Sequence, residues 1–209
     1  MAEAPDAGHP PVLLLHGFLG TRGSMWLLER RLLDDGFTVV SYRLGPFNSG
    51  SIIKSAEKVA RRVEALLESA GVEELDVVGH SMGGLIALHY VRSLGGAARV
   101  RRLVALGTPF SGTWVAGVGV VAMGLLSPGT WQLLPGHPLL KELREGPLPG
   151  NVRFYTIRGT RDWICPFAGT HLPGSQQIIL PCDHAELVTS AEVYAAIRAC
   201  LLDPESPAP

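Results

Sequence analysis

The sequence predicts an α/β domain with a mostly parallel central sheet and helices on both of its faces. Short runs rich in Val, Ile and Leu alternate along the chain with segments of helical spacing, and this alternation is typical of parallel strands connected by helices. The apolar runs resemble strands that are buried on both faces. Hydrophobic residues make up 46% of the 209 residues, which is enough for one sizeable core.

The expected elements follow one another in a regular order. We expect strands over residues 12–15, 38–42, 75–78, 102–106, 152–157 and 177–180, and helices over residues 24–35, 52–70, 82–94 and 190–202. Gly71 stands where the second helix needs a C-terminal cap. One face of that helix is apolar and consists of Ile53, Ala56, Val59, Ala60, Val63, Leu66 and Leu67.

Composition and the chain ends exclude several classes of function. The formal net charge of -1 gives no reason to expect a nucleic-acid partner, and no apolar run approaches the roughly 18 residues of a membrane span. The first residues, MAEAPDAGHPP, lack the basic and apolar regions of a signal peptide. The compartment therefore stays open between the cytoplasm and secretion after removal of a leader. We expect one domain over residues 1–209, with flexible tails at 1–10 and 203–209, acting as a monomer.

The motif Gly79-His80-Ser81-Met82-Gly83 matches G-x-S-x-G and stands directly between an expected strand and an expected helix. This is the context of a nucleophile elbow, a sharp turn that holds its serine in a strained conformation with the hydroxyl exposed. The N-terminus of the following helix favours negative charge at the same place. The alternative is a glycine-rich connection with an incidental serine, and the flanking elements favour the elbow.

A nucleophilic serine needs a base and an acid, which follow it in the order Ser, acid, His. His184 comes just after the 177–180 strand and before the last helix, where the base is expected. His171 and His137 are the other downstream histidines, and neither directly follows an expected strand. We therefore predict that His184 is the base.

The acid is expected after the 152–157 strand. That strand runs into Gly159 and then Asp162, whose carboxylate can orient an imidazole and fix its tautomer. Asp183 ranks lower because adjacent side chains on a loop usually diverge from each other. Asp76 lies at the wrong end of its strand, so we assign it a structural role.

Two backbone N–H groups are expected to form an oxyanion hole. One belongs to Met82, the residue after the serine, and the other to Phe18, which follows the His16-Gly17 turn at the end of the first strand. A plain turn is the alternative interpretation of His16-Gly17.

These residues resemble the α/β-hydrolase superfamily, and within it small bacterial triacylglycerol lipases and carboxylesterases. The resemblance runs from about Val12 to Leu202 and rests on HGFLG, GHSMGGL, LVALGTPFSGT, GTRDWICP and DHAEL. The GTPFSGT block is typical of lipases. The resemblance implies an α/β-hydrolase fold with a small apolar cap or lid insertion. It also implies the same roles for Ser81, Asp162 and His184 and for the two oxyanion amides.

The chain departs from this family in two respects. Many secreted members carry a leader, and others bind structural calcium near the histidine loop, where Asp183 and Glu186 alone offer too few oxygen ligands here. We expect no metal and no organic cofactor. Of the three cysteines, Cys165 and Cys182 flank the two catalytic loops. A bridge between them is one possibility, and free buried thiols are the default expectation.

The segment 112–150 interrupts the alternation and is expected to be the cap or lid. It is punctuated by Gly and Pro and contains an apolar run at 115–126. Its inner face is expected to contact an acyl chain, and the alternative is a helical hairpin that packs on the core without gating. The residues expected to line the substrate pocket are Leu19, Trp114, Val115, Val118 and Met123, beside Phe18 and Met82.

The sequence thus predicts a serine carboxylic-ester hydrolase, a lipase or esterase. We expect it to act through an acyl-enzyme on lipid-like or short- to medium-chain esters, including substrate at a lipid–water interface. An acyltransferase with the same triad is the main alternative. A non-catalytic binding protein ranks lower because no triad member is missing. Dehalogenases and epoxide hydrolases rank lower still because they carry Asp at the elbow.

Overall fold

The computed structural model of the chain describes residues 9–42, 44, 48–117 and 127–204. A six-stranded sheet has the order β2-β1-β3-β4-β5-β6, and all of its neighbouring strands are parallel. The expected parallel sheet is confirmed, and each strand overlaps the range expected for it. The strands are β1 (Val12–Leu15), β2 (Val39–Ser41), β3 (Leu75–His80), β4 (Val100–Leu106), β5 (Arg153–Gly159) and β6 (Gln176–Leu180).

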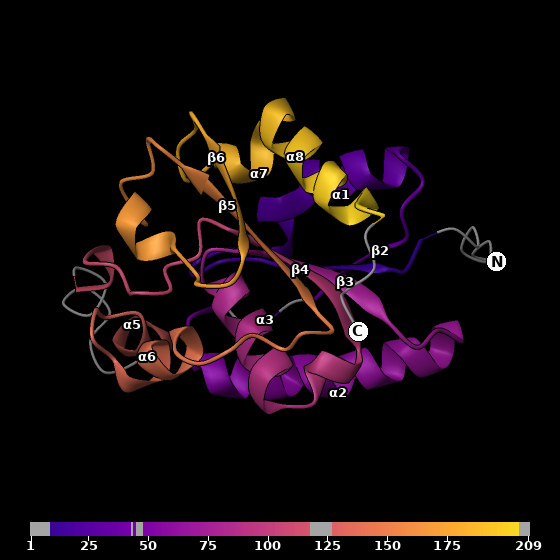
Figure 1. Cartoon of the computed structure of the whole chain (residues 1–209), viewed down its shortest axis with the longest axis horizontal. Coiled ribbons are helices and arrows are strands. Elements are labelled where there is room, and N and C mark those ends of the chain that lie inside the picture. The colour runs from indigo at the N-terminus through magenta and orange to yellow at the C-terminus, as the bar shows by residue number, and fades with distance from the viewer. Residues whose placement is uncertain (1–8, 43, 45–47, 118–126, 205–209) are drawn as a thin grey trace.

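Helices cover both faces of the sheet. Figure 1 shows α1, α7 and α8 on one face and α2, α3, α5 and α6 on the other. No helix within the described ranges combines the length and apolar character that a membrane crossing requires. The α-helices are α1 (Trp26–Asp34), α2 (Ile52–Ala70), α3 (Met82–Ser93), α5 (Pro128–Gln132), α6 (Pro138–Arg144), α7 (Glu186–Thr189) and α8 (Ala191–Leu202). Short 3-10 turns are η1 (Arg22–Met25), η3 (Gly96–Ala98) and η5 (Phe167–Thr170).

The central strands are buried on both faces, whereas the edge strands are not. In β1, Leu13 and Leu15 join the core under α2 and α3, and Val12 and Leu14 join the core under α1 and α8. This alternation follows from the two-residue period of a strand. The expectation of two buried faces is wrong for β2, which is half-buried throughout, and for β6, where Ile179 is 49% exposed. Both lie at an edge of the sheet, where the flanking helices cover less of the strand.

The helix α2 begins and ends at the expected residues. The Ser51 side chain accepts a hydrogen bond from the Lys54 N–H, and Gly71 has φ 65°, the left-handed conformation of a C-terminal cap. Its buried face contains Ile52 rather than Ile53, which is 38% exposed. The expected apolar face was therefore misplaced by one residue at its first turn. The helix presents Ile52 to the sheet because Ala56, Val59 and Val63 set the centre of the buried stripe.

The described part of the 112–150 insertion packs against α2 and α3. Leu139, Leu140 and Leu143 of α6 are buried in the same core as α3. At the start of α2, Gln132 Oε1 accepts a hydrogen bond from the Ile52 N–H at 2.6 Å. The apolar run expected at 115–126 lies largely outside the described residues, which resume at 127.

The two ends of the parallel strands carry different sets of polar residues. At the amino end of β3, Asp76 is buried and pairs with Arg101 at 2.9 Å and Arg102 at 3.4 Å, which agrees with the structural role expected for it. The segments that follow the carboxyl ends of β1, β3, β5 and β6 carry Phe18, Ser81, Asp162 and His184. Because all these strands are parallel, their carboxyl ends meet at one edge of the sheet.

Candidate active site

Ser81 occupies a strained turn between β3 and α3. Its φ of 53° and ψ of -124° are rare for a residue with a side chain. The first turn of α3 lies directly against the end of β1, since a Cβ added at Gly83 would lie 2.1 Å from the Leu15 carbonyl oxygen. The glycine at that position is therefore required by packing. The turn has the geometry expected of a nucleophile elbow.

Asp162 and His184 form a hydrogen-bonded pair. His184 Nδ1 lies 2.7 Å from Asp162 Oδ2, and the two side chains are 12% and 1% exposed. The other oxygen, Asp162 Oδ1, accepts the backbone N–H groups of Ile164 at 3.0 Å and Cys165 at 2.8 Å. Since a carboxylate only accepts, neutral His184 carries its proton on Nδ1 and keeps a lone pair on Nε2. The structure thus joins the two residues that the sequence predicted as acid and base.

Gly107, the residue directly after β4, lies against the Asp162–His184 pair. Gly107 follows β4 with φ 52°, and a Cβ added there would lie 3.0 Å from Asp162 Oδ2 and 3.2 Å from His184 Nδ1. A side chain at this position would therefore press on the hydrogen bond itself. Glycine at this position leaves room for the Asp162–His184 pair.

His80 contacts the His184 loop, a contact that the sequence did not predict. Its Nε2 donates to the His184 carbonyl oxygen at 3.1 Å, and the two ring centroids lie 4.6 Å apart. Burial, with a smaller contribution from the neighbouring His184, lowers the pKa of His80 to about 3. His80 is therefore neutral near pH 7, with its proton on Nε2. In the sequence, the only sign of a role for His80 is its place as the first variable residue of the G-x-S-x-G motif.

The loop after β1 lies against Ser81, as expected for an oxyanion hole. A Cβ added at Gly17 would lie 2.9 Å from Ser81 Cβ and 3.4 Å from Ser81 Oγ. The Met82 N–H belongs to the first residue of α3 and so has no acceptor within the helix. Among the described residues no acceptor takes the Phe18 N–H. Within the described residues, neither expected donor is used in a backbone hydrogen bond.

The Asn48 side chain is hydrogen-bonded to the backbone of this loop. Its Nδ2 donates to the carbonyl oxygens of His16 at 2.9 Å and Gly17 at 3.2 Å, and the residue is fully buried. Its φ of 45° is one that Asn tolerates better than most residues. His16 is also buried, which lowers the pKa of its imidazole. The sequence contained no signal for Asn48 because its partners lie more than thirty positions away.

The Cys165 thiol belongs to the same cluster. Its sulfur, a ring nitrogen of His184 and a carboxylate oxygen of Asp162 all lie within 4.8 Å of one another. Burial raises the pKa of the thiol, and a hydrogen bond with the Ser81 hydroxyl partly offsets this effect. Cys165, Cys182 and Cys200 are all free and buried, so the default expectation of free thiols is confirmed and Cys165 is not bridged to Cys182.

The competing candidates are engaged elsewhere. His171 Nδ1 is hydrogen-bonded to Gln177 Nε2, and His137 Nδ1 caps α6 by accepting the Leu139 N–H at 3.2 Å. Asp183 Oδ1 accepts the N–H groups of Ala185 and Glu186, both at 2.9 Å. These contacts give each residue a local structural role.

The residues expected to line the pocket are exposed rather than enclosed. Leu19 is 51% exposed, Trp114 79% and Val115 37%, whereas Val118 and Met123 lie outside the described residues. Trp163 was not predicted, is 72% exposed and adjoins Asp162. The Thr113 hydroxyl donates to the Ile164 carbonyl oxygen, so the chain carrying Trp114 is attached to the Asp162 loop.

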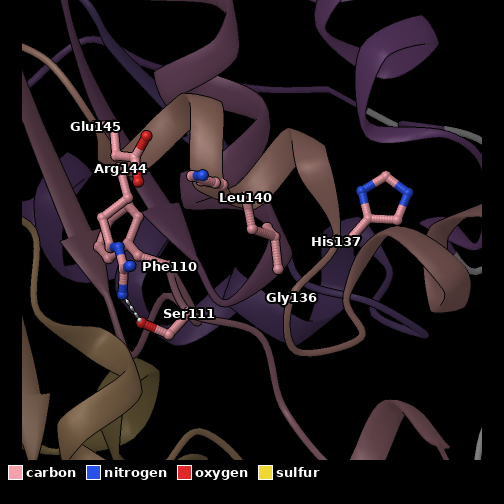
Figure 2. Close-up of a pocket in the computed structure, with 8 residues that line it drawn as sticks. Phe110, Ser111, Gly136, His137, Leu140, Arg144 and Glu145 are labelled. Atoms are coloured by element: carbon pink, nitrogen blue, oxygen red, sulfur yellow. Dashed lines mark hydrogen bonds between the residues drawn. The ribbon is translucent and has the colours of Figure 1, made fainter.

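A separate cavity of about 270 Å³ lies between α6 and the loop after β4. Figure 2 shows Arg144 reaching Ser111 there, with Nη1 donating to the hydroxyl at 2.7 Å. Phe110 and Ser111 belong to the GTPFSGT segment. The bond therefore ties this segment to α6 of the insertion.

Comparison with known proteins agrees with the fold. Residues 10–132, more than half of the chain, match the model of the alpha/beta hydrolase fold family. The chain belongs to this family. Its expected α/β-hydrolase fold is thereby confirmed.

Individual relatives match parts of this hydrolase-fold chain. A protein named carbamate hydrolase RutD from Klebsiella pneumoniae is 35% identical over 95 residues, which is 42% of this chain and 34% of that protein. A RutD of Escherichia coli is 34% identical over 92 residues, with the same shares. The chain therefore matches about a third of the length of these curated relatives.

Solved structures share the fold over almost the whole chain. The mature Bacillus licheniformis lipase BlEst2 superposes with a TM-score of 0.82 at 16% identity, over 95% of this chain and 94% of that one. The propeptide form gives a TM-score of 0.84 over 99% of this chain and 53% of that one, also at 16% identity. Aspergillus fumigatus lipase B gives 0.79 at 17% identity, over 98% and 55%. At these identities the likeness concerns the fold.

Proposed function

We propose that this chain is a serine hydrolase of carboxylic esters with Ser81 as nucleophile, His184 as base and Asp162 as acid. The observation that carries the proposal is the 2.7 Å bond between His184 Nδ1 and Asp162 Oδ2. It fixes the imidazole tautomer that can accept a proton on Nε2. The strained Ser81 turn at the carboxyl end of β3, in the same parallel sheet, supports the same assignment.

The reaction has two acyl-transfer steps. Ser81 Oγ attacks the ester carbonyl while His184 Nε2 takes its proton, and the N–H groups of Phe18 and Met82 hold the resulting oxyanion. His184 then protonates the departing alcohol, which leaves Ser81 acylated. In the second step His184 activates water, which releases the acid and restores Ser81. Apart from the substrate and this water, the proposed mechanism uses only protein side chains and backbone groups.

The apolar side chains around the strand ends support the proposed substrate class. Leu19, Trp114 and Trp163 are exposed next to the segments that carry Phe18, Thr113 and Asp162. They offer apolar area to an acyl chain of short to medium length or to a lipid surface. In this proposal the 112–150 insertion acts as the cap that completes the acyl site.

A chain-length series tests the proposal. p-Nitrophenyl esters from acetate to decanoate are assayed below and above their solubility limits, with wild-type protein and Ser81→Ala. We expect hydrolysis by the wild type only, and a rise above the solubility limit would identify action at an interface. Equal rates for the two proteins would exclude the esterase function. A fluorophosphonate probe that labels wild type but not Ser81→Ala identifies the nucleophile directly.

Carbamate hydrolysis is the second candidate, because the RutD relatives are named for it. Attack of Ser81 on a carbamate carbonyl would use the same base and oxyanion donors. A matched pair of p-nitrophenyl substrates, one ester and one N-alkyl carbamate with equal chain length, separates the two. We expect the larger kcat/KM for the ester. Product analysis with added alcohol in the same assay tests acyl transfer, which would give a new ester in place of the acid.

A further inference from the structure

The side chains of Asp162, Cys165 and His184 bring three different donor groups together at the active-site edge of the sheet. One ligand atom from each lies within 4.8 Å of the other two. Asp162 and Cys165 are buried, and the His184 side chain is 12% exposed. The acyl-transfer mechanism uses the aspartate and the histidine but gives the thiol no task. A thiolate, an imidazole and a carboxylate together form a ligand set that suits Zn²⁺.

The geometry needs only a small rearrangement to hold such an ion. In a tetrahedral zinc site the ligand atoms lie about 3.3–3.8 Å from one another, given metal–ligand bonds of about 2.0–2.3 Å. The three ligand atoms now lie at most 4.8 Å apart, so a movement of about 1 Å would bring the most distant of them into that range. Asp162 is already positioned, because its Oδ1 accepts two backbone N–H groups. The Ser81 hydroxyl interacts with the Cys165 thiol and so lies next to the cluster.

We propose that Asp162, Cys165 and His184 form an inhibitory site for Zn²⁺ and other thiophilic divalent cations. When the ion binds, a Zn–S bond replaces the S–H bond of Cys165 and one proton is released to solvent. No oxidation or reduction takes place. The imidazole coordinates as the neutral ligand, and Asp162 contributes a carboxylate oxygen.

Binding of the ion prevents His184 from acting as a base, whichever ring nitrogen coordinates it. If Nε2 binds the ion, its lone pair can no longer accept the Ser81 proton. If Nδ1 binds, the proton that it carried moves to Nε2, and Nε2 is again unable to accept. The metal-bound form is therefore a catalytically silent state of the proposed esterase. The inhibition, but not the metal binding, depends on that proposed function.

Cobalt spectroscopy tests the site without any use of activity. Purified protein is titrated with Co²⁺, and thiolate-to-cobalt charge transfer is followed in the near ultraviolet. We expect the band in wild type and in Ser81→Ala, its loss in Cys165→Ala, and its displacement by Zn²⁺. Cys182→Ala is the matched control, because Cys182 is also a free, buried thiol. A band that survives in Cys165→Ala, or the absence of a band in wild type, would overturn the proposal.

Inhibition is measured in parallel on the ester substrates. We expect Zn²⁺ to inhibit wild type reversibly, with recovery on adding a chelator, and we expect Cys165→Ala to need roughly 10-fold or more Zn²⁺ for half inhibition. Equal inhibition of both proteins would contradict a role for the thiol. A Cys165-dependent cobalt band in a protein without esterase activity would retain the metal site and reject the proposed function. If Cys165→Ala does not fold, Cys165→Ser provides the same comparison.

Discussion

His80 and His184, 104 positions apart, are joined by a hydrogen bond from His80 Nε2 to the His184 carbonyl oxygen at 3.1 Å, with ring centroids 4.6 Å apart. His80 immediately precedes Ser81, so this bond links the elbow to the loop that carries the proposed base. It is separate from the Asp162 contact, which holds the imidazole by its Nδ1. His80 thus binds the backbone of His184, the proposed base, and Asp162 binds its imidazole ring.

Replacing His80 should impair catalysis by releasing the His184 loop. We expect His80→Ala to lower kcat by roughly 10- to 100-fold with little change in KM, because a small displacement of the base affects the chemical step. His80→Gln retains an N–H donor and should recover part of the loss. Equal defects in the two variants, or a change confined to KM, would contradict a positioning role for His80.

Buried neutral histidines should make the fold sensitive to acid. Burial lowers the pKa values of His16, His80 and His89, and that of His80 to about 3. The unfolded chain therefore binds protons more readily than the folded one below about pH 6.5. The stability is fully present above this pH and falls as the pH decreases toward the folded pKa. Urea denaturation at pH 7, 6, 5 and 4 should show this decline, with a shallower slope in His80→Gln.

Members of the proposed triad should act as a unit. We expect Ser81→Ala and His184→Ala each to reduce kcat on the order of 10⁵- to 10⁶-fold, and Asp162→Asn to cost about 10⁴-fold. The double variant Ser81→Ala/His184→Ala should lose no more than either single variant, because each removal already abolishes the nucleophilic route. Active-site titration and single-turnover assays measure these rates. A multiplicative loss in the double variant would mean that the two residues act independently.

The residues of the proposed triad could be located from the sequence because each lies within a few residues of the carboxyl end of a strand. Strand ends can be located from the apolar runs, and parallel strands place their carboxyl ends together. On this basis Ser81, Asp162 and His184 were preferred to their competitors, and the structure brings Asp162 and His184 into contact. The order of serine, acid and histidine along the chain supplied the remaining constraint.

The contacts around the triad could not be predicted in the same way. His80, Asn48 and Cys165 contact their partners through loops whose approach depends on the whole fold, over separations of 104 residues for His80 and 32 for Asn48. Local patterns also do not encode strand order, so the exposure of β2 and β6 as edge strands was missed. The buried face of α2 was predicted one residue out of place at Ile52 for a similar reason. Helical spacing identifies a stripe, and packing on the sheet sets its phase.

Asn48 should matter both for the oxyanion loop and for folding. Its two hydrogen bonds hold the carbonyl groups that precede the Phe18 N–H. We expect Asn48→Asp to lower kcat by roughly 10-fold and to lower the free energy of unfolding by about 1–3 kcal/mol, because a carboxylate cannot donate to these carbonyls. Asn48→Gly is the control for the φ of 45°, since it removes both the donor and the backbone strain. Unchanged kcat in both variants would show that the loop is held without Asn48.

The ion pairs of Asp76 should contribute to stability without affecting catalysis. Asp76 is 1% exposed, and its partners Arg102 and Arg101 are 5% and 26% exposed. Asp76→Asn leaves the buried Arg102 guanidinium without its carboxylate, and we expect a loss of about 3 kcal/mol in the free energy of unfolding. The loss should stand at the lower end of such effects because Arg102 also donates to the Asp203 carbonyl oxygen. Arg101→Ala, which removes the more exposed partner of the same carboxylate, should cost about 1 kcal/mol or less.

Both variants should retain the wild-type kcat per folded molecule, since Asp76 lies at the edge of the sheet opposite Ser81. Urea denaturation and ester assays on the same preparations measure the two quantities, and a fall in kcat for Asp76→Asn would reveal coupling across the length of β3.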